Sequence, residues 1–416
     1  MSLPALFRTL FLFSPLLMPL TAAAADQAVD GLSPAQLNKI SEVVAVIKRE
    51  YVDATDDDKL LNDAIRGMVS GLDPHSSYLD YAAMKDNGVP NQGPFGGLGI
   101  EVAMEAGLVR VVAPIEDTPA YRAGIRAGDL ITMIDDAPVK GMTLGEAIQR
   151  MRGAPDSSVR LTIDRKNPAR ALSVSIVRAV INNPSVKIRL TEPGYPYLRI
   201  TQFRDRTGEE MARALQEIRE ENAAPLKGLV LDLRNNPGGS LVSAIAVASA
   251  FLKRDALVVS STGRARDTAI RLYANPDNYV EGGAENDYLK DLPPELRSIP
   301  MVVLVNAGSA SASEIVAGAL QDHRRATLLG SQTYGKGTIQ TLVPLSTGSA
   351  VKLTIARYST PAGRSIQAKG ISPDIVVAEA SPADELAPPP APGTGDDALY
   401  LQAIRFLKTG KTGEGR

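Results

Sequence analysis

The apolar positions near the start of the chain follow the spacing of helices. Between residues 32 and 52, a serine followed by a proline can cap and start a helix, and the later apolar side chains share one face. These side chains are Leu37, Ile40, Val44, Ile47 and Tyr51. A second stretch with the same spacing runs from Asp57 to Ser70. The pattern predicts an N-terminal helical region over residues 32–92, whose helices either pack internally or form a dimer.

From residue 94 to residue 180, the pattern changes to short runs rich in β-forming residues. Gly, Asp and Pro turn signals separate the runs, which are Val109–Ala113, Leu130–Ile134 and Val159–Ile163. One helix is predicted among them, from Thr143 to Arg152. The pattern therefore predicts a compact β-rich domain for this part of the chain.

The largest part of the chain, residues 185–378, has the pattern of an α/β core. Gly228–Leu233 and Met301–Val305 are almost continuously apolar, and a turn and a helix follow each run. Such runs are typical of buried parallel strands. Thr207 and Glu210 predict a capping box that opens a further helix.

Two segments of this half of the chain lack that pattern. Residues 261–300 are polar and predict an excursion over the surface. Residues 379–396 are rich in proline and predict a stiff linker. It leads to a C-terminal segment, residues 397–416, with a short amphipathic helix at 398–407 and a polar tail.

The first 25 residues have the build of a secretory signal peptide. Arg8 precedes an apolar run from Leu10 to Leu20, and the alanines at 22–25 form a small-residue cleavage site. The apolar run is about 11 residues long, short of the ~20 that a membrane-spanning helix needs. We therefore expect export to a bacterial periplasm with cleavage near residue 24–25, rather than an uncleaved anchor, and no integral membrane segment.

Composition and charge exclude several classes of function. Lys and Arg number 45 against 47 Asp and Glu, so the chain lacks the basic excess of a nucleic-acid-binding protein. The absence of cysteine excludes disulfides, thiolate metal sites and cysteine nucleophiles. With only His75 and His323 present, a multi-histidine metal site is not expected, and a Ser-His-Asp triad would need one of these two.

The first candidate chemical segment is residues 306–315, Asn-Ala-Gly-Ser-Ala-Ser-Ala-Ser-Glu-Ile. It directly follows the second apolar strand and opens a helix that runs through Asp322. A turn of small residues at this place can expose a serine hydroxyl, while the free N–H groups of the helix start favour an oxyanion. The alternative is structural, because Ser311 and Glu314 also fit a capping box.

The second candidate segment is residues 333–340, Thr-Tyr-Gly-Lys-Gly-Thr-Ile-Gln, with Lys336 between two glycines. A lysine that acts as a general base must be neutral, and at a reference pKa near 10.4 only about 0.04% is neutral at pH 7. Burial that lowered the pKa to about 7.5 would raise this share to roughly a quarter. Gln340 could hold the amine without adding charge. The alternative is a surface lysine in a hairpin.

The third candidate segment is residues 232–239, Asp-Leu-Arg-Asn-Asn-Pro-Gly-Gly, which links a buried strand to a helical run at 240–252. Gly238 and Gly239 can present N–H donors to an anion. A phosphate site would use such donors too, but the Gly-Lys-Ser/Thr ending of a P-loop is absent. A plain turn before a helix is the other alternative.

A glycine loop at residues 96–100, Gly-Gly-Leu-Gly-Ile, precedes the β-rich runs. Such a loop can aim N–H groups at a carboxylate, while the edge of the next strand pairs with an extended peptide. Alone it could be a tight turn. Together with Thr118–Ala120, Ala123–Ile125 and Gly128–Ile131, it resembles the bacterial PDZ domains, with their TPA..AGL..GD.I pattern.

Taken together, these segments closely resemble the carboxy-terminal processing peptidases, the serine-lysine family that includes the tail-specific proteases. The similarity covers about residues 32–378. It rests on SASASEI, YGKGTIQ and LDLRNNPGG, supported by residues 358–364 and 72–78. The resemblance implies an α/β, crotonase-like protease core with an inserted β-rich PDZ domain and an N-terminal helical region, and it implies neither a metal nor a cofactor.

By alignment, the resemblance gives a role to each residue of the candidate site. Ser311 becomes the nucleophile, Lys336 the general base and Gln340 the supporting amide. The oxyanion donors become the main-chain N–H of Ala312 and that of Gly238 or Gly239. The mechanism implied is attack on a peptide carbonyl, an acyl-enzyme and its hydrolysis.

The resemblance also gives roles to residues outside the core. His75 becomes structural, and we expect His323 to cap a helix end. The PDZ loop, Gly97, Leu98, Gly99 and Ile100, would bind a substrate's C-terminal carboxylate next to an apolar side chain. Some family members use this domain as an inhibitory gate, for which Arg178 is a candidate relay. A lipoprotein adaptor and a homo-oligomer are further expectations.

Two competing functions come from other classes. A non-catalytic PDZ scaffold on an inactive protease core is disfavoured because Ser311, Lys336 and Gln340 are all present. A crotonase-like acyl enzyme needs the fold but not the lysine, and export argues against a coenzyme A substrate.

Overall fold

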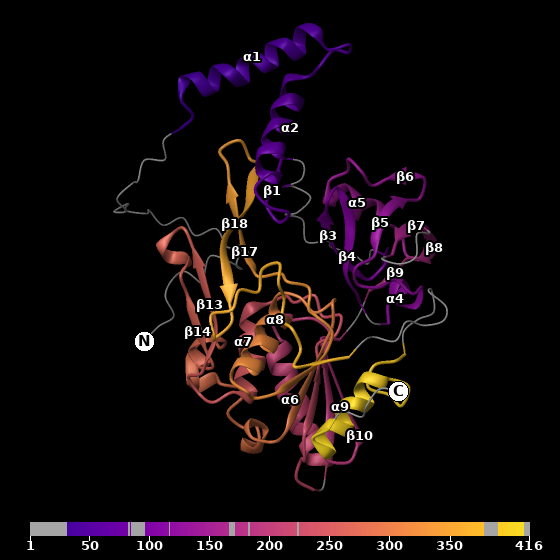
Figure 1. Ribbon diagram of the computed structural model, residues 1–416, viewed down its shortest axis with the longest axis vertical. Coiled ribbons are helices and arrows are strands. Elements are labelled where there is room, and N and C mark those ends of the chain that lie inside the picture. Colours follow the sequence, from indigo (N-terminus) through magenta and orange to yellow (C-terminus); the bar gives the residue numbers. More distant parts are fainter. Residues whose placement is uncertain are drawn as a thin grey trace. The chain divides into compact units, whose positions relative to one another are not determined.

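The computed structural model describes residues 31–81, 84, 96–115, 117–165, 171–181, 184–222, 224–377 and 390–411 (Figure 1). The predicted signal peptide and most of the Pro-rich linker lie outside these residues. By its contacts the chain divides into two units, residues 1–87 with 341–353 and residues 88–340 with 354–416. In the described part, no helix is long and apolar enough to cross a membrane.

The first unit contains the two helices that the apolar spacing predicts. Helix α1 spans Pro34–Glu50 and starts in a capping box, in which Ser33 and Gln36 exchange hydrogen bonds. Helix α2 spans Asp57–Ser70 and is capped by Asp56. Neither helix has a buried residue. The existence and the limits of both helices are therefore confirmed.

A short strand that the sequence does not predict closes this unit. Strand β1, Ser77–Leu79, pairs antiparallel with the first residues of β18, Ala350–Ser359. The carboxylate of Asp73 accepts hydrogen bonds from the main chain of His75 and Ser76, and so shapes the loop before β1. The segment at 72–78 therefore forms the loop before β1 and the first two residues of that strand.

The β-rich module forms as predicted, and its ends meet. Strands β2 and β9, Gly96–Gly97 and Ala179–Val180, pair with each other. The main sheet has the order β3-β4-β5-β7-β8, with β6 beside β5. These strands span Ile100–Glu105, Leu108–Pro114, Leu130–Ile134, Ser158–Asp164 and Leu172–Val177, with β6 at Ala137–Pro138, and the helices α4 and α5 span Pro119–Arg122 and Leu144–Met151. Strand β3 lies at the edge of this sheet.

The α/β core is built on a six-stranded sheet with the order β10-β11-β12-β15-β16-β19. The strands span Val186–Glu192, Tyr195–Ile200, Leu229–Asp232, Met301–Val305, Thr327–Gly330 and Ile375–Val376. Strand β10 is antiparallel to β11, and the other neighbours are parallel. Strands β12 and β15 are buried along their whole length, as their apolar runs predict. Their carboxyl ends therefore deliver the loops that follow them to one edge of the sheet.

Helices cover both faces of this sheet (Figure 1). Helices α6, α7 and α8, at Thr207–Glu221, Leu241–Phe251 and Ala312–Asp322, pack against one another on one side. Helix α9, Ala398–Thr409, lies on the other side against β12, β15 and β16. The last part of the predicted linker packs against the protein as well, because Pro392 and Gly393 are buried. The described end of the linker, from residue 390, therefore lies against the core.

Two predictions about the core are wrong. The capping box of Thr207 does not form, because the threonine hydroxyl accepts from Arg204 N and donates to Gln202 O instead. The polar segment at 261–300 is only partly a surface excursion. Strands β13 and β14, Leu257–Gly263 and Arg271–Tyr273, pair with each other, and β13 pairs with β18. A short 3-10 helix at residues 266–268 lies between β13 and β14, three more follow at 276–278, 283–286 and 294–297, and apolar side chains such as Leu296 are buried.

Candidate active site

The three segments singled out in the sequence meet at the carboxyl ends of β12 and β15. The loop after β12 contacts the loop after β15, since Ser309 Oγ donates to Leu233 O at 2.8 Å and Ala310 N donates to Asn236 O at 3.0 Å. The segment before β17, Thr338–Pro344, joins them, because Tyr334 N donates to Ser309 O at 3.0 Å. Parallel strands place these loops together although the sequence separates them widely.

Ser311 is the last residue before helix α8 and has a strained main chain. Its φ of 54° lies in the left-handed region that side chains other than glycine rarely adopt. Strain of this kind costs about 1–3 kcal/mol and persists only where neighbours hold it. Its side chain is partly exposed, while Ala312 and Ser313 are buried. The turn therefore presents this one serine of the motif.

The glycines after β12 lie against this serine. A methyl group on Gly238 would come within 2.8 Å of Ser311 Cβ and 2.9 Å of Ala312 N. The N–H of Gly238 is already used, since it donates to Asn236 Oδ1 at 2.9 Å. Among the described residues, the main-chain N–H groups of Gly239 and Ala312 have no acceptor. Two unused donors thus flank the serine.

Lys336 is partly buried in the loop before β17. Gly335 next to it has a φ of 92° and lies so close to residues 368–370 that a methyl group would approach their main chain to 3.1 Å. Within the described part of the chain, the amine of Lys336 forms neither a hydrogen bond nor an ion pair. The amine is therefore not tied to an acid, which a general base requires.

Gln340 is held by two threonines rather than by the lysine. Its Nε2 donates to Thr338 Oγ1 at 2.7 Å and to Thr354 Oγ1 at 3.3 Å. These bonds use the donor side of the amide and leave the Oε1 atom as its acceptor. No hydrogen bond joins Gln340 to Lys336 in the described residues.

Sequence analysis missed the most connected side chain of the site. Glu314 is fully buried, and its carboxylate accepts hydrogen bonds from the main chain of Ser311, Gly335 and Lys336 and from the hydroxyl of Thr333. Burial raises the pKa of this carboxyl, and the four donors only partly offset the effect. The capping-box pattern was the only signal of it.

A second buried acid supports the loop after β12. Asp232 is fully buried and accepts from Tyr197 Oη at 2.7 Å, while Arg199 and Arg234 form ion pairs with it. Burial would raise the pKa of Asp232, but the two guanidinium groups outweigh it and lower the pKa to about 2. Arg234 also pairs with Asp397, the residue that caps α9, at 2.6 Å. The C-terminal helix is thus tied to the strand that carries the glycine loop.

His323 lies too far from Ser311 to act as a triad member. His323 ends helix α8, whereas Ser311 precedes it, so the two residues lie about 18 Å apart at 1.5 Å per residue. The ring of His323 contacts Leu257 O at 2.7 Å. Asp322 beside it pairs with Arg364, within the motif at 358–364. The main-chain N–H of His75 donates to Asp73 Oδ1 at 2.8 Å in the loop before β1, and its structural role stays a prediction.

The glycine loop of the PDZ module has the features expected of a carboxylate cradle. Gly99 has a φ of 78°, and its carbonyl accepts from Thr118 Oγ1 at 3.1 Å. The N–H groups of Leu98 and Gly99 have no acceptor in the described residues. Ile100 then begins the edge strand β3, whose outer side pairs with no other strand in the described part of the chain, and such an edge can accept an added strand.

Two arginines of the PDZ module have different surroundings. Arg178 is buried, and among the described residues it donates within the module, to the carbonyls of Arg150, Met151 and Ser158 and to Ser157 Oγ, each at 2.9 Å. Arg110 lies instead 5.3 Å from the centre of the Tyr334 ring, next to the glycine that precedes Lys336. The contact to the lysine loop thus comes from Arg110, and a relay through Arg178 stays a prediction.

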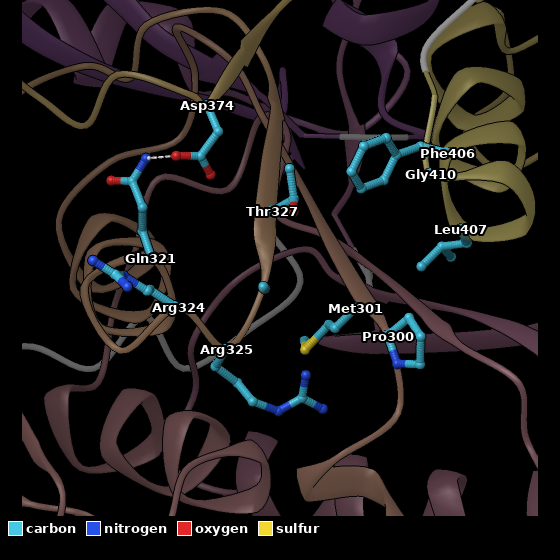
Figure 2. Close-up of a pocket in the computed structure, with 11 residues that line it drawn as sticks. Pro300, Met301, Gln321, Arg324, Arg325, Thr327, Asp374, Phe406, Leu407 and Gly410 are labelled. Atoms are coloured by element: carbon cyan, nitrogen blue, oxygen red, sulfur yellow. Dashed lines mark hydrogen bonds between the residues drawn. The ribbon is translucent and has the colours of Figure 1, made fainter.

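A pocket lies at the other end of the same strands (Figure 2). Its lining includes Met301 and Thr327, the first residues of β15 and β16, and Phe406 of α9. Arg325 faces it, but its guanidinium already donates to Phe251 O, at the end of α7. Because the candidate nucleophile follows the opposite end of β15, this pocket is separate from the candidate active site.

Profiles of known families match three parts of the chain. Peptidase family S41 matches residues 194–377, a PDZ domain matches residues 110–165, and the N-terminal domain of the activating protease CtpB matches residues 19–83. The first two matches lie within the predicted core, 185–378, and the predicted PDZ domain, 94–180. The third overlaps both the predicted signal peptide and the helical region.

Whole-chain relatives agree with these matches. A carboxy-terminal-processing protease of Bartonella bacilliformis is 46% identical over 348 residues, 83% of this chain and 76% of the relative. The carboxy-terminal processing protease CtpB of Bacillus subtilis is 34% identical over 364 residues, 86% of this chain and 72% of the relative. Among solved structures, the photosystem II D1 C-terminal processing protease has a TM-score of 0.66 and 29% identity, covering 89% of this chain and 99% of its own.

Fold, site and PDZ module together define a class, the serine-type peptidases built on an α/β core. The chain belongs to peptidase family S41, in which its relatives are carboxy-terminal processing proteases. The family and the fold predicted from the sequence are therefore confirmed. The family membership also favours a peptidase over the crotonase-like acyl enzyme.

Proposed function

We propose that this protein is an exported endopeptidase that cleaves protein substrates at or near their C-termini through a Ser311/Lys336 dyad. One observation carries the proposal. The main-chain N–H groups of Ser311 and Lys336 donate to the same oxygen of Glu314, at 2.8 and 2.9 Å. The main-chain nitrogens of these two residues, which are 25 positions apart in the sequence, therefore lie within two hydrogen-bond lengths of each other.

The reaction needs one proton acceptor and one nucleophile. The neutral amine of Lys336 takes the proton of Ser311 Oγ while that oxygen forms a bond to the peptide carbonyl carbon. The C–N bond then breaks, and the proton passes from the lysine to the leaving amine. Water, activated by the same amine, hydrolyses the resulting ester and regenerates the serine.

The oxyanion of the tetrahedral intermediate needs donors that are not otherwise engaged. The N–H groups of Ala312 and Gly239 fit this need, since neither has an acceptor in the described residues. Gly238 is less suited because its N–H donates to Asn236. We therefore assign the second donor to Gly239. Gln340, whose amide donors are taken by two threonines, would offer its oxygen to the amine of Lys336.

Substrate capture is proposed for the PDZ module. The residues of its loop, Gly97, Leu98, Gly99 and Ile100, would receive a C-terminal carboxylate, and β3 would pair with the preceding residues of the substrate. The open edge of β3 and the unused N–H groups of Leu98 and Gly99 support this role. An apolar last side chain is the expected ligand, and Arg178 stays the candidate relay of a gate.

Location and assembly are further parts of the proposal. The signal-peptide pattern of residues 1–25 supports export to the periplasm, and a lipoprotein adaptor rests on the family resemblance alone. A homo-oligomer is supported by α1, whose Leu37, Ile40, Val43 and Val46 are 43–54% exposed. Val43→Glu should then lower the molar mass measured by light scattering, and an unchanged mass would exclude this face.

The test is digestion of casein and of a peptide with an apolar C-terminus by the wild type and by Ser311→Ala. We expect kcat of the variant to be at least about 1,000-fold lower, because the two residues of the dyad act as a unit and removing one abolishes the contribution of both. Melting temperatures should agree, which separates chemistry from folding. A variant that keeps near wild-type turnover contradicts the dyad, and an inactive wild type favours the PDZ scaffold.

A further inference from the structure

Four hydrogen bonds converge on one carboxylate in the candidate active site. Glu314 Oε1 accepts from Thr333 Oγ1 at 2.6 Å and from Gly335 N at 2.7 Å. Glu314 Oε2 accepts from Ser311 N at 2.8 Å and from Lys336 N at 2.9 Å. The side chain is fully buried, so water does not compete for either oxygen.

All four partners are donors, which restricts the chemical state of the side chain. Three are main-chain N–H groups, and the fourth is the hydroxyl of Thr333, which donates to Glu314 while its oxygen accepts from Ile371 N at 2.6 Å. Only an ionised carboxylate offers acceptor sites for four donors. A glutamine would turn its NH₂ group toward two of them. The donor set therefore fits the anion, and bonds to an ionised acceptor are the stronger kind.

A helix cap does not explain this arrangement. A capping box requires one bond from the acid to the main chain of the residue before the helix, here the bond to Ser311 N. The other three donors belong to residues 333–336, on a different segment of the chain. Glu314 is therefore fixed to the helix of the serine while it holds the loop of the lysine.

The geometry of both held segments shows why such a support is needed. Ser311 has a φ of 54°, a main-chain conformation that a residue other than glycine keeps only where its neighbours hold it. The loop of Lys336 has no regular secondary structure before β17. A rigid acceptor common to both segments would set the distance from the serine to the amine.

We propose that Glu314 is a positioning residue, whose buried carboxylate holds the main chain of Ser311 and of Lys336 in the geometry that proton transfer requires. This inference rests on the proposed Ser311/Lys336 dyad. The carboxylate acts through the two main chains and does not itself touch the substrate.

The central variant is Glu314→Gln, which keeps the shape and removes two acceptor sites. We expect kcat to fall at least about 100-fold, since a misplacement of about 1 Å between reacting groups costs this much. KM should stay within about threefold because the substrate contacts are intact. Thr333→Val, which removes one donor of the four, should lower kcat less, by about tenfold.

A matched control separates this role from the loss of any glutamate charge. Glu295→Gln removes an acid that pairs with Arg219 at 3.2 Å, away from the three loops of the site. Its kcat should remain within about twofold of the wild type. The melting temperature of each variant shows whether the fold survives, and Thr333→Val keeps the proposal testable if Glu314→Gln does not fold.

Amide hydrogen exchange gives a readout that does not depend on activity. In Glu314→Gln, the segment 333–337 should exchange at least about tenfold faster, because a hydrogen bond to a charged group contributes about 1.5–3 kcal/mol. Strand β15 should keep its protection. Unchanged exchange in 333–337, or a kcat within threefold of the wild type, overturns the proposal. If instead Ser311→Ala stays active, the dyad fails while the exchange result still decides whether Glu314 holds the loop.

Discussion

Two fully buried carboxylates support neighbouring loops of the site, and their charge is balanced in different ways. Asp232, at the end of β12, faces the guanidinium groups of Arg199 and Arg234, which bring its pKa down to about 2 despite burial. Glu314, on the first turn of α8, has no ion pair in the described residues and relies on three main-chain N–H groups and a hydroxyl. Burial leaves its pKa raised.

The difference follows from what each acid must hold. Asp232 anchors β12 to the C-terminal helix α9 through Arg234 and Asp397, and a strong ion pair at this place does not interfere with the reaction. A direct pair between Glu314 and Lys336 would instead hold the proton on the amine. Main-chain donors stabilise the acid without such a pair. The main-chain N–H groups thus stabilise the carboxylate of Glu314, while in the described residues the amine of Lys336 pairs with no acid.

The largest expected effect comes from breaking the Asp232 cluster. Asp232→Ala removes the carboxylate that two buried guanidinium groups and Tyr197 Oη share, so we expect the free energy of unfolding to fall by about 3–5 kcal/mol. Urea unfolding in the Ser311→Ala background, which the proposed mechanism makes inactive, measures this without self-digestion. Asp63→Ala is the control, because its ion pairs are exposed and should contribute less than about 1 kcal/mol. An equal loss in both variants would contradict the account.

Arg178 extends the comparison to a cation, since it is buried with four oxygen acceptors and has no carboxylate partner among the residues that the structure describes. Arg178→Ala leaves those acceptors unpaired, and we expect the PDZ module to lose about 2–3 kcal/mol of stability. The rate of proteolysis of the module by an added protease checks this in the Ser311→Ala background. Unaltered resistance would show that the four bonds contribute little. Unaltered basal activity in the active background would separately count against a relay through this residue.

The dependence of stability on pH should have opposite signs for the two acids. The lowered pKa of Asp232 means that its contribution is present above about pH 4 and is lost as the pH falls from about 4 toward 2, a change of about 2 kcal/mol. The raised pKa of Glu314 means that its ionisation costs stability as the pH rises above the ordinary value of 4.5.

Urea unfolding between pH 2 and pH 7 measures both signs on Asp232→Asn and Glu314→Gln, again with Ser311→Ala. The advantage of the parent over Asp232→Asn should grow as the pH rises through 2–4. Its advantage over Glu314→Gln should shrink above pH 4.5. Two slopes of the same sign would refute the distinction between the clusters.

Local patterns in the sequence predict the elements but not the partners that hold them. Helices α1 and α2 and strands β12 and β15 appear where apolar spacing places them, because each pattern is complete within one segment. Thr207 shows the limit of such patterns, since its hydroxyl finds acceptors and donors that the capping motif does not include.

The candidate site shows the same limit over longer distances. Turns and motifs are enough to single out Ser311, Lys336 and the two glycines. The hydrogen bonds that Glu314 accepts from the lysine loop come from residues 19 to 22 positions later, so the sequence shows only the capping pattern of this acid. Asp397 pairs with Arg234, 163 positions earlier, after a segment that composition predicts to be a linker. Only the packed sheet, which sets loops and helix side by side, creates these contacts.

The most direct test of the account is the rate of peptide cleavage by Lys336→Met at saturating substrate, beside the wild type. Methionine fills a similar space but cannot accept the serine's proton. With general-base catalysis contributing about 100- to 10,000-fold, we predict a fall of at least about 100-fold in kcat at an unchanged melting temperature. A Lys336→Met enzyme that turns over within tenfold of the wild type would show that the proton of Ser311 goes elsewhere.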